Sequence, residues 1–184
     1  FAVPMDDANG DVPIDSFKEN FKGVLSFIGI DQQTGGMDLS FQIEAPGINF
    51  DLSHAGKKKS GDWFFFSCYN SEKANTLLEV NASQNDKDFI MAVNWKKAAE
   101  LVKAGKGRKV TTEYAHNTWD ESTHSATSTM KKEVVVLSVE DMKDAMFMIP
   151  CPKSPHGCDV DPTGEYIIGS GKLAALIPVF SFDK

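Results

Sequence analysis

Cysteine and histidine are scarce in this sequence, and their spacing excludes several familiar metal and redox sites. The chain has 184 residues, with three cysteines and four histidines. An odd cysteine count rules out complete pairing within the chain, and there is no Cys-x-x-Cys motif or Cys/His set with zinc-finger spacing. Cys68, Cys151 and Cys158 each lie beside an apolar or strand-like segment, so we expect small buried thiols.

The sequence also lacks long hydrophobic runs and an excess of positive charge. No apolar run approaches the ~20 residues that cross a bilayer, so no membrane span is predicted. The net charge of −7 disfavours nucleic acid and anionic membranes as main partners, because both require a positive surface. No signal peptide is visible, but the chain begins at Phe1. We therefore expect a processed or cut start, and export stays open.

Short β-strand patterns separated by turns make up most of the chain. Residues 23–31 and 37–45 flank a Gly-containing turn, which predicts a hairpin. Further strands are predicted at 62–69, 89–95, 108–115, 132–139, 146–150 and 173–183, the last with Pro178 at an edge or a bulge. The segments predicted to be irregular are the lead-in 1–20, the loops 46–61 and 116–131, and a long polar excursion over 70–88.

A single short amphipathic helix is predicted after the strand at 89–95. Apolar side chains recur at positions 95, 98, 99 and 102, which is the spacing of one helix face. Asn94 is suited to cap the N-terminal end, and Gly105 is suited to follow the C-terminal end.

Many short strands with one helix predict an all-β fold, which would be a sandwich, a barrel or a propeller. The segments VLSFIGID (24–31), FIMAVNW (89–95) and PVFSFD (178–183) each place an alternating apolar strand before Asp or Asn. Repetition of this kind favours the propeller.

His156 is the most distinctive candidate for a functional residue. In PHGC (155–158), Pro155 fixes its own backbone φ and Gly157 permits unusual backbone angles. The imidazole is thus held on a stiff support, as suits a metal ligand, although a lone histidine more often caps or packs. The other histidines lie in predicted polar loops and are expected to be exposed to solvent: His54, His116 and His124.

A second group of candidate ligands follows a predicted strand. In CYNSEKA (68–74), Tyr69, Asn70 and Glu72 come directly after that strand, and oxygen-rich loops suit a hard cation such as calcium. The segment NDKD (85–88) offers more oxygen atoms. No EF-hand pattern occurs, so a helix cap with solvated acids is the competing interpretation. No hydrolase, phosphate-loop or dinucleotide motif is present.

Two motifs together resemble the catalytic domain of the nitrous-oxide reductase family. CYNSEKA (68–74) and PKSPHGCDVDPTGEYIIGSGKL (152–173) occur in the order and at the separation seen in the family. The strand 89–94 and the helix after it are also similar. The resemblance implies a seven-bladed β-propeller followed by a cupredoxin domain. Residues 1–184 would then be a propeller fragment of roughly three blades, without the cupredoxin domain.

The family's activity is the expectation that this resemblance brings. Its members reduce nitrous oxide to dinitrogen and water in denitrification, with electrons from a donor such as cytochrome c or a cupredoxin. The resemblance implies a periplasmic or exported enzyme that is a homodimer when intact. It also implies a four-copper sulfide cluster bound by seven histidines, and a two-copper site in the cupredoxin domain. With one such histidine, the fragment alone is expected to be inactive.

The resemblance assigns roles to individual residues. His156 matches a ligand of the four-copper cluster and is therefore the residue expected to take part in catalysis. The positions that match calcium ligands are Tyr69, Glu72, Asp88 and, where the family often has Asn, Ser154. Calcium bound there would hold the 70–88 excursion against the segment that carries His156.

A different class of function is also consistent with the sequence. The chain could be a non-catalytic β-propeller module, related to the enzyme but used as a binding scaffold. Paired histidines upstream and a cupredoxin Cys motif downstream in the full-length gene product would favour the enzyme.

Overall fold

Strands dominate the structure, as the sequence predicts. The computed structural model describes residues 2–6, 22–30, 32–33, 37–46, 49–69, 88–120, 125–151, 155–171 and 175–183. Within these residues the strands form three separate sheets. The predicted all-β class is therefore confirmed, and the described residues contain one short α-helix at the predicted position.

The first sheet contains the predicted N-terminal hairpin. Its strands are β1 (Ala2–Asp6), β2 (Lys22–Ile30), β3 (Met37–Pro46), β7 (Arg108–Asp120) and β8 (Ser125–Leu137), in the order β1-β2-β3-β8-β7. β2 and β3 pair antiparallel, and their apolar side chains alternate toward the core. Phe27 and Phe41 stack there with ring centroids 4.5 Å apart. β1 lies in the segment that was predicted to be irregular. Its sequence has little apolar alternation, and it is ordered as a strand by pairing with β2.

The second sheet is a four-stranded antiparallel meander. Its strands are β4 (Asn49–Ala55), β5 (Trp63–Tyr69), β6 (Phe89–Asn94) and β9 (Met146–Pro150), in that order across the sheet. The prediction of a loop over 46–61 was wrong, because that stretch contains β4 and a 3-10 turn, Lys58–Ser60. β4 is mostly polar, and its pairing with the apolar strand β5 orders it.

The third sheet carries the PHGC segment. It consists of β10 (Pro155–Val160), β11 (Tyr166–Gly171) and β12 (Val179–Ser181), which pair antiparallel in that order. A strand over 173–183 was predicted with Pro178 inside it. The structure starts β12 directly after Pro178, at the sheet edge, because proline has no N–H for the ladder.

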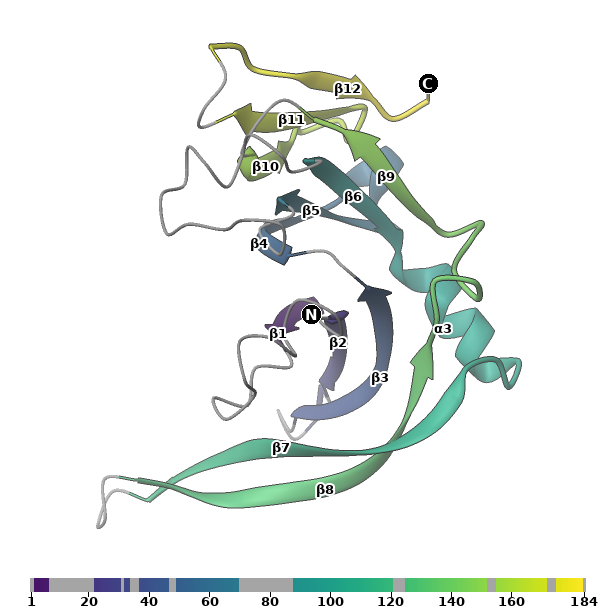
Figure 1. Cartoon of the computed structure of the whole chain (residues 1–184), viewed down its shortest axis with the longest axis vertical. Coiled ribbons are helices and arrows are strands. Elements are labelled where there is room, and N and C mark those ends of the chain that lie inside the picture. The colour runs from purple at the N-terminus through teal and green to yellow at the C-terminus, as the bar shows by residue number, and fades with distance from the viewer. Residues whose placement is uncertain are drawn as a thin grey trace.

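The three sheets stand side by side, with β1, β4 and β10, the first strand of each, toward the same side of the molecule (Figure 1). One apolar core lies between the first two sheets and the helix, and includes Leu25, Ile43, Phe66 and Met91. A second lies between the second and third sheets around Phe65, Ile90 and Ile167. Successive sheets that pack against one another are consistent with three blades of a propeller.

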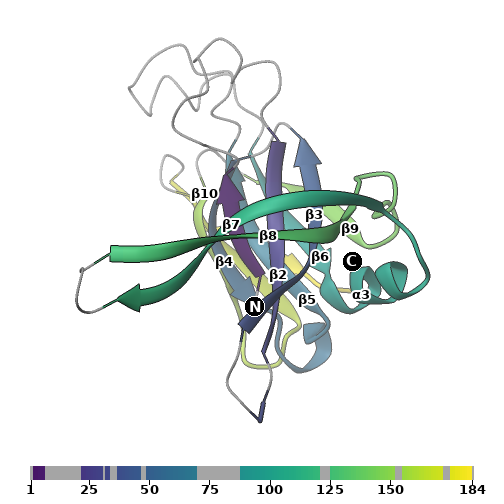
Figure 2. The ribbon, with the colours of Figure 1, turned by 90° about the horizontal axis from the view of Figure 1, so that it is seen from below.

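The segment between β6 and β9 links the first two sheets. It begins with the predicted helix, α3 (Trp95–Lys103), whose N-terminus is capped by Asn94 Oδ1 accepting from Lys97 N at 2.8 Å. It continues as the long ribbon β7–β8, which extends beyond the sheet (Figure 2). Residues 116–120 and 125–131 of the predicted loop are therefore strand. β8 pairs in parallel with β3, and the Arg108 guanidinium donates to both carboxylate oxygens of Glu44.

Some predictions fall outside the described residues, among them most of the lead-in 1–20 and the excursion 70–87. Of the helices in the described parts of the chain, none is long and apolar enough to cross a membrane.

Candidate metal centre

The candidate centre forms where β4 and β10 meet, so it joins two sheets. The Lys57 ammonium, just after β4, donates to the Val160 carbonyl at 2.6 Å. The Cys158 thiol donates to the Phe65 carbonyl at 3.3 Å. These contacts hold β10 against the neighbouring sheet.

His156 sits at a β-bulge in β10. The pairing of β10 with β11 joins Pro155 to Gly171 and Gly157 to Ser170, so His156 is the extra residue between them. A bulge re-aims the side chain of the extra residue and bends the strand. The stiff setting predicted for His156 is thus a strand irregularity bounded by Pro155 and Gly157.

The imidazole of His156 is oriented by a carboxylate from β4. Its Nδ1 lies 2.6 Å from Asp51 Oδ2. The Asp51 side chain is 18% exposed and the His156 side chain 60% exposed. Since a carboxylate can only accept, Nδ1 donates its proton there, and in the neutral ring Nε2 then carries the lone pair. Among the described residues Nε2 has no hydrogen-bond partner, which is the arrangement of many metal-binding histidines.

Asp51 is also placed by a bulge. The pairing of β4 with β5 shifts register between Phe50 and Ser53, which leaves Asp51 and Leu52 in the irregular stretch. The Ser67 hydroxyl on β5 accepts from the Leu52 N–H at 3.1 Å and donates to the Leu52 carbonyl at 3.3 Å. The backbone next to Asp51 is therefore fixed by the neighbouring strand.

Sequence reasoning missed Asp51. The nearest signal was the alternation of Phe50 and Leu52 with polar residues, which is typical of a half-buried strand. That signal would have misplaced the side chain, because Leu52 is 52% exposed whereas Asp51 is mostly covered. The bulge in β4 turns the Asp51 side chain toward the covered face of the strand and the Leu52 side chain toward solvent.

His54 is not the exposed loop residue that the sequence predicted. It lies in β4, where Nε2 is 3.0 Å from Asp159 Oδ1 and Nδ1 is 2.7 Å from the Ala55 carbonyl oxygen. Its ring is 31% exposed. His116 is likewise in a strand, β7, rather than a loop, and His124 lies outside the described residues.

Two of the predicted calcium ligands lie at one end of the second sheet. Tyr69 is the last residue of β5, and Asp88 immediately precedes β6 and is buried. The pairing of β5 with β6 ends with Cys68 opposite Phe89, so the next positions along the two strands are Tyr69 and Asp88. The Asp88 carbonyl also accepts from the Cys151 N–H at 3.0 Å, which brings it beside the chain that leads to β10.

The other two predicted calcium ligands, Glu72 and Ser154, lie outside the described residues. In the part of the chain that the structure describes, no three His, Cys, Asp or Glu side chains gather closely enough to hold a metal ion. The described residues therefore bring Tyr69 and Asp88 to the same sheet end and place His156 on the adjoining sheet.

The three cysteines are poor candidates for metal-binding thiolates. Burial raises the pKa of Cys68 strongly, and raises the pKa of Cys158 to about 12 and of Cys151 to about 11, the latter with a smaller effect from Asp88. All three thiols are therefore protonated at neutral pH. Cys68 is fully buried as predicted, and the other two are partly covered.

Comparison with known proteins gives related sequences. No protein-family profile matches the chain. The chain is 32% identical over 150 residues to a nitrous-oxide reductase from Pseudomonas fluorescens, covering 80% of this chain and 20% of the relative. It is 29% identical over 157 residues to a nitrous-oxide reductase from Stutzerimonas stutzeri, covering 84% and 21%. The chain thus spans about a fifth of the length of the curated relatives it matches, and over that length it is related to nitrous-oxide reductases.

Proposed function

We propose that this chain is a portion of a nitrous-oxide reductase, in which His156 binds copper and a calcium site lies nearby. The single observation that carries the proposal is the imidazole of His156, held through Nδ1 by the mostly covered Asp51 carboxylate. The names of the two relatives supply the reaction class, the reduction of nitrous oxide.

The donor chemistry of His156 fits copper. Imidazole nitrogen is a common copper ligand, and hydrogen bonding at Nδ1 leaves Nε2 as the coordinating atom. Bound copper would supply electrons to nitrous oxide and polarise it. The contribution of this chain is to aim the ring: Asp51 fixes its tautomer and rotation, and the bulge between Pro155 and Gly157 fixes its backbone.

Calcium is the second part of the proposal, with Tyr69, Glu72, Asp88 and Ser154 as the side chains that hold it. Its support is that Tyr69 and Asp88 occupy neighbouring register positions, and that the Asp88 carbonyl is bonded to Cys151 N. Oxygen ligands from separate segments suit calcium. The ion would join the 70–88 excursion to the chain entering β10, and so steady His156.

The rest of the proposed enzyme follows from the family resemblance. It comprises a seven-bladed propeller with a four-copper sulfide cluster, a cupredoxin domain with a two-copper site, and a periplasmic homodimer that takes electrons from a cytochrome c or a cupredoxin. Because the copper cluster needs ligands in addition to His156, residues 1–184 by themselves should not reduce nitrous oxide. Reduction of nitrous oxide by residues 1–184 alone would contradict the fragment proposal.

The copper proposal is tested on the full-length gene product, with His156→Ala compared with His54→Ala. We expect His156→Ala to lower bound copper, measured by mass spectrometry, to change the visible absorption, and to abolish nitrous-oxide reduction measured by gas chromatography. His54→Ala should leave copper content unchanged, because both of its ring nitrogens face protein acceptors. A full-length product that binds no copper and is inactive would support the scaffold alternative.

The calcium proposal has its own experiment. We expect calcium to raise the melting temperature and to slow proteolysis within 70–88, relative to protein in chelator. Glu72→Ala should remove both effects, whereas Glu140→Ala, an exposed turn carboxylate, should keep them. Equal melting temperatures in calcium and in chelator would count against the site.

A further inference from the structure

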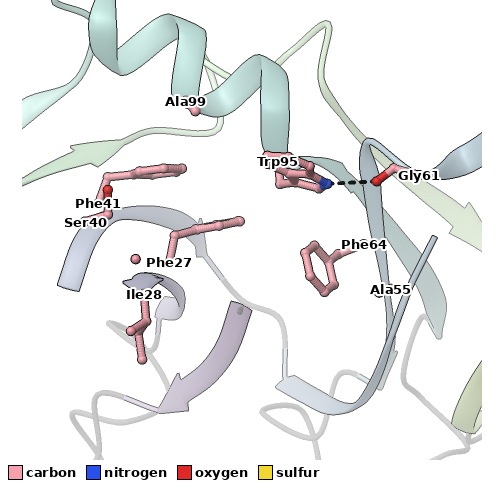
Figure 3. A pocket seen from close by; sticks show the side chains of 10 residues that line it. Phe27, Ile28, Ser40, Phe41, Ala55, Gly61, Phe64, Trp95 and Ala99 are labelled. Carbon is pink, nitrogen blue, oxygen red and sulfur yellow. Dashed lines mark hydrogen bonds between the residues drawn. The ribbon is translucent and has the colours of Figure 1, made fainter. Parts of the chain in front are cut away.

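A cavity of about 440 Å³ lies between the first sheet and the second sheet with its helix, away from His156 (Figure 3). Phe27 and Phe41 of β2 and β3 form one wall. Phe64 of β5 and Trp95 at the start of α3 face them across the opening. Its volume lies in the range of cavities that hold small molecules.

Three of the four aromatic rings are held by contacts within the protein. Phe27 and Phe41 stack with an interplanar angle of 9°, and both are at least 93% buried, with exposed fractions of 7% and 6%. The Trp95 indole N–H donates to the Gly61 carbonyl at 3.1 Å, which holds the ring at the cavity mouth. That N–H is consequently engaged within the protein, and Trp95 offers a ligand its apolar surface.

The described residues that line the cavity carry no charge. Among its described lining residues no side chain is acidic or basic, and the only hydroxyl is that of Ser40. Lys96 and Asp62, the sequence neighbours of the lining residues Trp95 and Gly61, pair with each other at 3.1 Å, and Lys132 pairs with Asp38. A charged ligand would therefore lose its hydration without gaining a counter-ion.

A second cavity of the molecule differs in this respect. About 410 Å³ in volume, it lies between the second and third sheets, and Trp63 and Phe182 line it together with Asp183. Its aromatic rings are thus accompanied by a carboxylate, which the first cavity does not have. That carboxylate is paired with the Lys59 ammonium, so an ion pair borders the second cavity, whereas no charged residue is among the described residues that line the first.

We propose that the cavity lined by Phe27, Phe41, Phe64 and Trp95 binds a neutral, flat aromatic molecule of one or two rings. Such a molecule can stack on the fixed rings in the offset and edge-to-face arrangements that aromatic pairs prefer. Apolar cavities of this kind also accept benzene-sized molecules readily. This site is independent of the copper and calcium proposals.

The test is binding of three fluorinated probes to the purified protein, followed by fluorine NMR. The probes are 5-fluoroindole, which is neutral, 5-fluorotryptamine, which is a cation, and 5-fluoroindole-3-acetate, which is an anion. We expect 5-fluoroindole to bind at least tenfold more tightly than either charged probe. Comparable affinity for all three probes, or no binding of 5-fluoroindole, would overturn the proposal.

Matched substitutions on the same helix locate the binding. Ala99 lines the cavity, so Ala99→Phe should fill it and weaken 5-fluoroindole binding at least tenfold. Ala104→Phe makes the same change at the exposed end of the helix and should leave binding unchanged. Unchanged binding in Ala99→Phe would overturn the assignment.

Two further variants test the same site if Ala99→Phe fails to fold. Trp95→Leu removes an aromatic ring from a partly exposed position, and should weaken binding several-fold. Phe147→Ala alters the second cavity and should leave 5-fluoroindole binding as it is. The opposite pattern, loss in Phe147→Ala but not in Trp95→Leu, would place the probe in the second cavity and refute the proposal.

Discussion

Two histidine–aspartate contacts join β4 to β10, and they differ in which partner is covered. In the first, Asp51 is 18% exposed and His156 60% exposed. Three residues further along both strands the order is reversed: His54 is 31% exposed and Asp159 68% exposed. The strands thus present one contact with its imidazole toward solvent, and one with its carboxylate toward solvent.

The difference decides which histidine is suited to bind a metal. Both nitrogens of His54 face acceptors, the Ala55 carbonyl and the Asp159 carboxylate, so neither nitrogen is available to a ligand. For His156, Nδ1 alone faces an acceptor within the part of the chain that the structure describes. A covered carboxylate beside an exposed imidazole leaves the second ring nitrogen available to a ligand. A covered imidazole beside an exposed carboxylate serves to link the two strands.

The largest loss of stability is expected when the packing of β10 on β4, on which both contacts depend, is disrupted. Gly164 has φ +76°, and a Cβ there would lie 1.7 Å from the Lys57 carbonyl oxygen, just after β4. Gly164→Ala should therefore force the turn after β10 away from β4. We expect a loss of about 3 kcal/mol of unfolding free energy, measured by urea denaturation.

Gly105→Ala is the control for this prediction. Gly105 has a similar φ of +78°, but a Cβ there would meet nothing within 4 Å. Its loss should be only about 1 kcal/mol, the cost of a left-handed conformation for alanine. Equal losses in the two variants would show that the approach to Lys57 is unimportant.

Removing one carboxylate at a time separates the roles of Asp51 and Asp159. In the full-length gene product, Asp51→Asn should weaken copper binding about 10- to 100-fold, as loss of a carboxylate behind a ligating histidine does. Asp159→Asn should have little effect, because its partner His54 is not expected to bind metal. Copper titration with a competing chelator measures both. Equal weakening in the two variants would mean that the contacts are equivalent.

The elements with strong apolar alternation were predictable. The hairpin β2–β3, the strands β5, β6 and β9, and the cap of α3 by Asn94 all have local signals in the sequence. β4 and the outer half of the β7–β8 ribbon were not predicted, because they have little apolar alternation and their order comes from pairing with the next strand along the chain. Local periodicity cannot report such pairing.

The candidate site divides in the same way. His156 could be singled out because its stiff flanks, Pro155 and Gly157, are its sequence neighbours. Asp51 could not, because it is distant in the sequence and reaches the ring only through two bulges and the packing of one sheet on another. A contact of that kind depends on tertiary structure alone.

A smaller effect on stability is expected in the turn that follows β10, where Asp161 is hydrogen-bonded. The Asp161 carboxylate accepts from the Thr163 hydroxyl and from the N–H groups of Thr163, Glu165 and Tyr166. These bonds, the Thr163 hydroxyl first, lower the pKa of Asp161 from 3.8 to about 2. Because the folded-state pKa is lowered, this stabilisation is present above pH 3.8 and is lost as the pH falls toward 2.

We therefore expect Asp161→Asn to be less stable than the unsubstituted protein at pH 5, with the difference shrinking toward pH 2. Melting temperatures measured between pH 2 and pH 6 test this. Asp144→Asn, which changes an exposed carboxylate in another turn, should keep the original pH dependence. A constant difference between Asp161→Asn and the unsubstituted protein over that range would contradict the linkage.

The smallest effect on stability is expected for His54, whose contact with Asp159 only links β4 to β10. Because the Asp159 carboxylate is largely exposed and lies 4.0 Å from the Lys57 ammonium as well, its contact with His54 is shared and screened by solvent. His54→Gln should lower the unfolding free energy by at most about 0.5 kcal/mol, as exposed pairs do, measured by urea denaturation. Copper affinity of the full-length gene product should not change. A drop in copper affinity as large as that of Asp51→Asn would mean that the exposed nitrogen of His156 depends on both contacts, and the distinction between them would fail.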